Sequence, residues 1–290
     1  MKQWFKKWAM FLLLTVMVLP SFHVSAASEI DFEQGSMSDE EYVRHVLTQF
    51  NELDGYRSEM LDEMTGGSTV MIYDKAVGVT KITTHMVANA YTDETTIIQY
   101  VYDDGTMVSD EVAYLESSIP LMSEIYPEFE TQVEELRAQM GDKLVIQPPM
   151  EGVEATEAAA AFVVDDIVFS EVTKEGDVVK ATLDEATYLA ENPDMAQSYP
   201  ENTKFLMLYT IDPAAGSVTS TLTIDVDEDA VASEESSDEM GINLAAMMSD
   251  MTVNVVVTAT DEKVPSLDEL PTITDEEYQQ LLTDIGIEAY

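Results

Sequence analysis

The chain has 290 residues, of which 57 are acidic and 13 basic, so its formal net charge is -44. Phosphate recognition needs clustered cations, and this charge therefore argues against nucleic acid as a partner. An anionic membrane surface would also repel the chain. Cysteine is absent, which excludes disulfides, thiolate metal sites, cysteine nucleophiles and a lipid anchor on cysteine. Hydrophobic residues make up 46% of the chain, enough for a packed core.

The N-terminus has the order of an export signal. Basic residues precede an apolar run, a proline and small residues that end at Ala26. The run is shorter than the roughly 20 apolar residues that cross a bilayer. We expect a signal peptide over 1–26 and a secreted or cell-wall-associated mature protein over 27–290, with no transmembrane segment. Cleavage after Ala27, or retention as an anchor, is the alternative.

The first expected helix begins at a capping box, in which Ser38 and Glu41 satisfy each other's backbone amides. Its apolar residues lie on one side, and it ends near Gly55. From about 68 to 115 the sequence consists of short segments rich in Val, Ile, Thr and Tyr. This pattern predicts antiparallel strands joined by tight turns, the clearest at 81–91 and 95–102.

A second helix is expected to start at Pro127, where the missing amide does no harm, and to end before Gly141. Its apolar side chains recur at spacings of four, three and four residues, which predicts one buried face. These side chains are Phe129, Val133, Leu136 and Met140.

Strand patterns return in the second half of the chain. The hairpin 204–226 has the cleanest alternation of apolar and polar residues, on either side of a Pro-Ala-Ala-Gly turn. A capping box from Thr274 to Glu277 begins a short terminal helix. The other expected elements are strands at 162–170, 178–183 and 252–260 and a short helix at 184–191.

An insertion at about 227–250 interrupts the last hairpin. Its first half is acidic and serine-rich, which predicts a flexible solvated loop. A calcium loop is the alternative because aspartates alternate from Asp225 to Asp229. However, Ala230 and Ser236 stand where an EF-hand has Gly and Glu. The methionines of the second half predict either core packing or a soft apolar lid.

Motifs of enzyme chemistry are missing from the sequence. It contains no G-x-S-x-G elbow, phosphate-binding glycine loop, H-E-x-x-H or dinucleotide fingerprint. Beyond the signal the histidines are His45 and His85, which suit surface positions on a helix and a strand. A Ser/His/Asp site assembled in space from either one is the alternative. We expect a non-enzymatic protein with no catalytic residues, no cofactor and no metal site.

Three stretches resemble, in their order along the chain, the secreted LolA-like and LppX-like proteins, particularly uncharacterised lipoproteins of Gram-positive bacteria. The stretches are VVKATLDEATYLAENPD, FLMLYTIDPAAGSVTSTLTIDVDED and MTVNVVVTATDEKVPSLDELP. The chain departs from the lipoprotein members because it has no Cys at the cleavage site. The resemblance implies a strongly curved antiparallel half-barrel wrapped around helices, and an exported carrier of a lipid or similar apolar molecule.

The expected fold is a single α+β domain over 27–290, in which a curved antiparallel sheet (half-barrel) packs on the two longer helices. An apolar ligand would lie between sheet and helices. A filled core is equally consistent with the same residues. Those expected to face this interior are Val43, Leu47, Phe50, Phe129, Val133, Leu136, Leu222, Ile224, Val255 and Val257.

Two other functions stay open beside the carrier. An acidic extracellular or cell-envelope interaction protein would have a filled core and would meet a cationic partner through its surface. A secreted hydrolase would gather polar groups around His45 or His85.

The export signal makes the first testable prediction. N-terminal sequencing of protein recovered from culture fluid or cell wall should begin Ala27-Ser28-Glu29. Full-length protein that keeps Met1 in the cytosol would contradict export.

Overall fold

The computed structural model describes residues 30–61, 66–89, 92–147, 167–191, 203–225 and 251–287. Within these residues the protein is a mixed α/β fold with mostly antiparallel strands. The chain divides into two compact units. Unit 1 comprises Phe50–Phe162 and Ala259–Tyr290 with the N-terminal segment, and unit 2 comprises Ile30–Gln49 and Val163–Thr258. The expected single domain over 27–290 stays a prediction.

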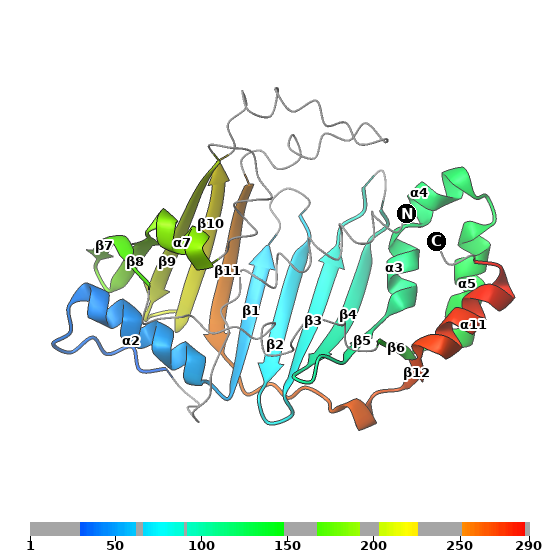
Figure 1. Ribbon diagram of the computed structural model, residues 1–290, viewed down its shortest axis with the longest axis horizontal. Helices are drawn as coiled ribbons and strands as arrows, with labels where there is room; N and C mark the ends of the chain where they lie inside the picture. Colours follow the sequence, from blue (N-terminus) through cyan, green and yellow to red (C-terminus); the bar gives the residue numbers. More distant parts are fainter. Residues whose placement is uncertain are drawn as a thin grey trace. The chain divides into compact units, whose positions relative to one another are not determined.

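The strands of unit 1 lie in the order β12-β6-β5-β4-β3-β2-β1 (Figure 1). Neighbouring strands are antiparallel, except that β12 runs parallel to β6. Their bounds are β1 Gly55–Leu61, β2 Ser68–Asp74, β3 Val79–Met86, β4 Thr95–Tyr102, β5 Met107–Ser109, β6 Leu144–Gln147 and β12 Thr272–Thr274.

The helices of unit 1 gather at one edge of its strand order, beside β5, β6 and β12 (Figure 1). They are α3 Glu111–Ser117, α4 Ile119–Ile125, α5 Phe129–Met140 and α11 Asp275–Ile285. The predicted helix before Gly141 is confirmed as α5, and its four apolar residues are buried. They join one apolar cluster with Val112 of α3, Val145 of β6, and Tyr278 and Leu282 of α11.

The opposite face of unit 1 is covered by the connection that leads to β12. Thr260 donates its amide to the Gly55 carbonyl at 3.2 Å, so the connection starts beside β1. A Cβ at position 55 would lie 2.8 Å from the Thr260 carbonyl oxygen, which explains the glycine there. Farther along, the connection adds its apolar side chains to a second cluster. These are Val264, Leu267 and Leu270, packed with Ile72, Val79, Tyr100, Tyr102 and Val108.

Asp74 anchors this connection. Its carboxylate is almost fully buried at the end of β2. Oδ1 accepts from the Ala76 amide at 3.0 Å, and Oδ2 accepts from the buried Val264 amide at 3.3 Å. Lys263 Nζ, on an exposed side chain, lies 3.5 Å from Oδ1. One carboxylate thus ties the β2–β3 turn to the C-terminal connection.

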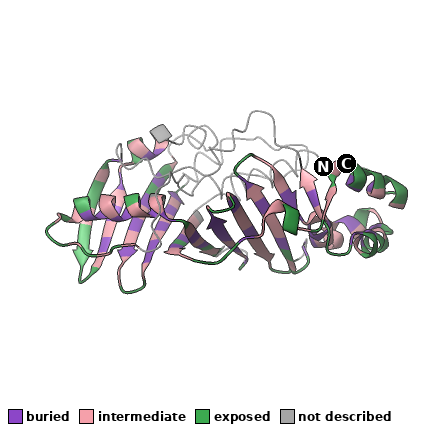
Figure 2. Cartoon of the chain, turned by 90° about the horizontal axis from the view of Figure 1, so that it is seen from below, coloured by how far each residue is buried: buried purple, intermediate pink, exposed green. Residues whose placement is uncertain are grey.

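The strands of unit 2 lie in the order β11-β10-β9-β8-β7 and are all antiparallel. Their bounds are β7 Phe169–Glu175, β8 Val178–Leu183, β9 Lys204–Asp212, β10 Ser217–Asp225 and β11 Met251–Ala259. Buried residues alternate with half-buried or exposed ones along β8, β9 and β10, whereas the end strand β7 is mostly exposed (Figure 2). The predicted hairpin 204–226 is confirmed as β9 and β10.

Two helices contact the strands of unit 2. The predicted capping box is confirmed at α2 (Asp39–Glu52), where the Ser38 amide donates to Glu41 Oε2 at 2.8 Å. On α2, Arg44 donates to the Ile167 carbonyl at 2.5 Å and lies 5.1 Å from the Phe169 ring centre. This contact holds α2 at the start of β7. The other helix, α7 (Glu185–Glu191), lies against β9.

The two faces of the unit 2 strands differ sharply. The inner face is buried and carries Val179, Ala181, Leu183, Phe205, Met207, Tyr209, Ile211, Val218, Ser220, Leu222, Ile224, Val255 and Val257. The outer face is half-buried to exposed. By strand register it includes Lys180, Thr182, Lys204, Leu206, Leu208, Thr210, Asp212, Thr219, Thr221, Thr223, Asp225, Thr252, Asn254 and Val256.

The described sheet is not closed, because β12 and β7 have only one strand neighbour each. Several elements lie where the sequence pattern predicted something else or nothing. Strand β1 and the parallel pair of β12 with β6 were not expected. The helix α3 begins inside the region expected to be strands, and α4 follows just after it. None of the described helices is long and apolar enough to span a membrane.

The Asp74 anchor predicts a specific loss of stability. Replacing Asp74 with Ala leaves the buried Val264 amide without its acceptor, at a cost of about 1–3 kcal/mol in the free energy of unfolding. Denaturant unfolding of the mature protein measures this cost. The exposed Asp142→Ala variant removes the same charge and should stay within about 0.5 kcal/mol of the original protein. Equal effects of the two variants would contradict the anchor.

Candidate functional site

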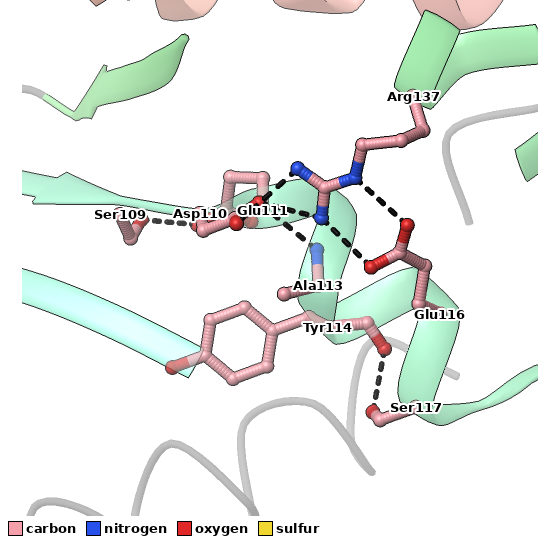
Figure 3. Close-up of polar contacts among 8 residues, drawn as sticks. All are labelled: Ser109, Asp110, Glu111, Ala113, Tyr114, Glu116, Ser117 and Arg137. Carbon is pink, nitrogen blue, oxygen red and sulfur yellow. Dashed lines mark hydrogen bonds and ion pairs between the residues drawn. The ribbon is translucent and has the colours of Figure 1, made fainter. Parts of the chain in front are cut away.

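A polar network joins α3 and α5 in unit 1 (Figure 3). Arg137 of α5 forms a two-pronged ion pair with Glu116 of α3, from Nε to Oε1 at 2.7 Å and from Nη2 to Oε2 at 2.8 Å. The same guanidinium reaches both oxygens of Asp110, with Nη1–Oδ2 at 3.2 Å and Nη2–Oδ1 at 3.1 Å. All three of its nitrogens are therefore engaged, and Arg137 holds the two helices together.

Asp110 also begins α3. Its Oδ1 accepts from the Ala113 amide at 3.0 Å, which caps the helix N-terminus. One carboxylate thus serves the helix cap and the ion pair with Arg137. The negative charge is favourable at this position because the helix dipole is positive there.

Glu111, the next residue, lies partly buried between the helices and the strands. Its Oε1 accepts from Ser109 Oγ at 2.5 Å and from Gln147 Nε2 at 2.6 Å. Burial raises the pKa of Glu111, the Ser109 hydrogen bond opposes this rise, and the nearby charges of Asp275 and Asp110 add to it. Glu111 is therefore an acid whose ionisation is disfavoured in the folded protein.

Two tyrosines share this environment. Burial raises the pKa of Tyr114 on α3, and the charges of Glu111 and Asp110 raise it further. Burial likewise raises the pKa of Tyr278 on α11. Both phenols stay protonated at neutral pH, so neither provides an ionised base or nucleophile.

An open hollow of about 610 Å³ lies beside the network. Its lining includes the Arg137 guanidinium together with three acids, Asp93, Glu94 and Glu116; the other lining residues are Ala88, Thr95, Thr96, Ala113 and Ile119. Because Arg137 is already paired, the hollow presents a net negative charge. It suits neither an anionic headgroup nor a purely apolar ligand.

His85 lies next to two residues of the hollow. Its Nδ1 is 3.4 Å from Thr96 Oγ1, and its Nε2 is 3.9 Å from Glu94 Oε1. The second distance is longer than a hydrogen bond, and both the His85 and Glu94 side chains are exposed. These groups do not form the hydrogen-bonded triad that a hydrolase would need. His45 lies on α2 and is half-buried.

The described residues contain no group of three or more His, Cys, Asp or Glu side chains arranged to hold a metal ion. The calcium-loop alternative depends on residues after Asp225, which lie outside the described residues. The same holds for the predicted flexibility of the acidic insertion and for the predicted packing of its methionines.

All ten residues expected to face an apolar interior are buried. Four of the ten belong to unit 1. Phe129, Val133 and Leu136 are part of the apolar cluster that α5 forms with α3, α11 and β6, whereas Phe50 lies near the end of α2. The six in unit 2 lie on α2 and on two neighbouring strands. They are Val43, Leu47, Leu222, Ile224, Val255 and Val257.

A further buried surface was missed by sequence reasoning. Cross-strand pairing brings Tyr56 opposite Tyr73, Ser58 opposite Met71, and Met71 opposite Ile82. We call these five residues the Ser58 face; each is at most 7% exposed. The two tyrosine rings lie 5.4 Å apart. Alternation along β1 of Tyr56, Ser58 and Met60 with charged residues was the available sequence signal.

Ser58 is the unusual member of this face. It is 0% exposed, and its Oγ has no hydrogen-bond partner among the described residues. A buried hydroxyl without a partner is rare because it loses its water without replacement. The Ser58 face lies on β1, β2 and β3, whereas the helices α3, α4, α5 and α11 lie at the opposite edge of the unit 1 strand order (Figure 1).

The Glu111 environment predicts an unusual pH dependence. Its folded-state pKa is raised, so the folded state holds this proton more tightly than the unfolded state does. The stability contribution is present at low pH and is lost as pH rises from the unfolded value through the folded one. Glu111→Gln should therefore raise the melting temperature at pH 7, and the gain should shrink toward pH 4.

Glu134→Gln on the exposed side of α5 is the matched control, because it removes the same charge from a strongly acidic protein. The gain at position 111 should exceed the gain at position 134 at pH 7. Equal gains would mean that general repulsion, rather than the site, is responsible.

The sequence matches no protein-family model and no curated protein. The resemblance to LolA-like proteins therefore stays a prediction.

Proposed function

We propose that the chain is an exported, non-enzymatic binding or carrier protein for a lipid or another apolar molecule. The ligand binds at the Ser58 face of unit 1, within a sheet that curves as a half-barrel. Since each residue of this face is at most 7% exposed without a ligand, binding displaces what covers the face. The observation that carries this proposal is the fully buried Ser58 Oγ without a hydrogen-bond partner among the described residues.

The chemistry of the Ser58 face supports this class of ligand. Tyr, Met and Ile side chains offer a largely apolar surface, and ligand sites for apolar molecules combine such surfaces with a few polar groups. Burial raises the pKa of Tyr73 to about 12, with Asp103 and Asp74 adding to the rise, so the face carries no phenolate. A lipid with one hydroxyl or carbonyl group satisfies the Ser58 hydroxyl and leaves the rest of its surface in apolar contact.

The hollow beside Arg137 fits this ligand less well. Its acids outnumber its single, already paired cation, and a lipid would lose more from contact with charge than it gains. The Ser58 face is accordingly the better candidate within unit 1.

The test starts with mature protein covering residues 27–290, purified from its host. Mass spectrometry of an organic extract should reveal a co-purifying lipid, and a fluorescent fatty acid should bind the delipidated protein. Ser58→Ala should weaken that binding about 5–10-fold, which corresponds to one hydrogen bond of about 1 kcal/mol. Without ligand, the same variant should be as stable as the original protein or more stable.

Ser220→Ala is the matched control. Ser220 is also a buried serine on a strand, but its Oγ contacts Met207 Sδ at 3.2 Å and lies in unit 2. Fatty-acid binding by this variant should be unchanged. A clean extract together with no binding of the fluorescent probe would contradict the carrier proposal.

A further inference from the structure

The strand register of unit 1 joins the Ser58 face to the polar network around Glu111. Residues that stand directly opposite each other on antiparallel strands have their side chains on the same face of the sheet. One such row crosses five strands, from β1 to β5, and consists of Ser58, Met71, Ile82, Gln99 and Ser109. Ser109, at the far end, donates its hydroxyl to Glu111 Oε1 at 2.5 Å. The Ser58 hydroxyl and the Glu111 carboxylate therefore belong to one continuous face.

Polar groups stand at both ends of this row, and apolar ones lie between them. Ser58 and Ser109 are 0% exposed, and the side chains of Met71 and Ile82 between them are also buried. Gln99, the neighbour of Ser109, is half-buried. Ser109 has a hydrogen-bond partner in Glu111, whereas Ser58 has none among the described residues. The row is thus apolar over β2 and β3 and polar on either side.

The row is about as long as one lipid chain. Neighbouring strands lie about 4.8 Å apart, so Ser58 on β1 is about 14 Å from Gln99 on β4 and about 19 Å from Ser109 on β5. Each leaflet fills half of the roughly 30 Å hydrocarbon core of a bilayer, so one acyl chain covers about 15 Å. A single chain that lies across the strands can therefore reach from one polar end of the row to the other.

The Glu111 end of the row is unfavourable for a negative charge. Burial raises the pKa of Glu111, and the nearby charges of Asp275 and Asp110 add to the rise. Arg137 is the cation of this network, but it already pairs with Asp110 and Glu116. A carboxylate or phosphate headgroup placed here would be repelled, whereas a hydroxyl group could donate a hydrogen bond to Glu111.

We propose that the ligand is an uncharged single-chain lipid with a polar group at each end, such as a long-chain diol, and that Glu111 selects against anionic lipids. The inference rests on the proposed carrier function. The chain crosses β2 and β3 in contact with Met71 and Ile82. One hydroxyl pairs with Ser58, and the other meets the Gln99 amide and the Glu111 carboxylate. Glu111 is accordingly the residue that determines headgroup specificity.

The test measures how well three ligands of equal chain length displace the fluorescent fatty acid from delipidated mature protein at pH 8. Hexadecanediol, with a hydroxyl at each end, should bind about 5–10-fold more tightly than hexadecanol, because of one added hydrogen bond. Hexadecanol should in turn bind at least about tenfold more tightly than palmitic acid, which brings a carboxylate close to those of the protein.

Two kinds of failure can be told apart. If the fluorescent probe does not bind at all, the carrier function itself fails. If the probe binds but hexadecanol and palmitic acid have equal dissociation constants, or the diol has no advantage over hexadecanol, the carrier function stands and this inference is overturned.

Three variants assign the selectivity to the two ends of the row. Glu111→Gln should bring the dissociation constants of palmitic acid and hexadecanol close together. The matched control Glu134→Gln removes the same charge from the exposed side of α5 and should leave their ratio unchanged. Ser58→Ala should abolish the advantage of the diol and leave that ratio unchanged. Melting curves check that all three variants fold. Equal effects of the variants at positions 111 and 134 would mean that overall charge selects the ligand, which would overturn the role of Glu111.

Discussion

A shortage of cations is the constraint on which the structure depends. With 13 basic residues for 57 acids, most carboxylates cannot form ion pairs, and backbone amides take the place of the missing cations. Hydrogen bonds from the Ser38 and Thr274 amides lower the pKa of Glu41 and Glu277 at two helix starts. Asp110 caps α3, and Asp74 accepts from two amides. Carboxylates at helix N-termini are stabilised by the dipole even where no lysine or arginine is near.

The same constraint explains which elements were predictable. Capping boxes and alternating strands are local signals, and α2, α5, α11, β9 and β10 follow from them. The helix α3 was missed because its cap, Asp110, is one acid among many and its seven residues contain only two helical turns. The parallel pair of β12 with β6 joins residues about 130 positions apart and is only three residues long, so no local pattern marks it.

The candidate site residues, like the secondary-structure elements, were predictable only where a local sequence pattern marks them. Burial of the ten apolar candidates could be predicted, because it follows from periodicity within each element. The environments of Ser58 and Glu111 could not, since each depends on what neighbouring strands and helices bring close. The outer face of unit 2 is intermediate: the Thr alternation on β10 was visible in the sequence, but its continuation by β9 and β11 depends on strand register. Unit 1 thus supplies the proposed ligand contact.

The connection over unit 1 also bears on the order in which the protein folds. Unit 1 takes its first strands from the N-terminal half of the chain and its last strand and helix from residues after 258, with most of unit 2 between them. During synthesis Asp74 must wait for the chain to grow by 190 residues before Val264 reaches it, and β6 must wait for about 130 residues before β12 reaches it. With this topology unit 1 cannot complete its fold until nearly the whole chain has been synthesised. In the proposed export, the chain would therefore stay unfolded enough to pass through an export channel.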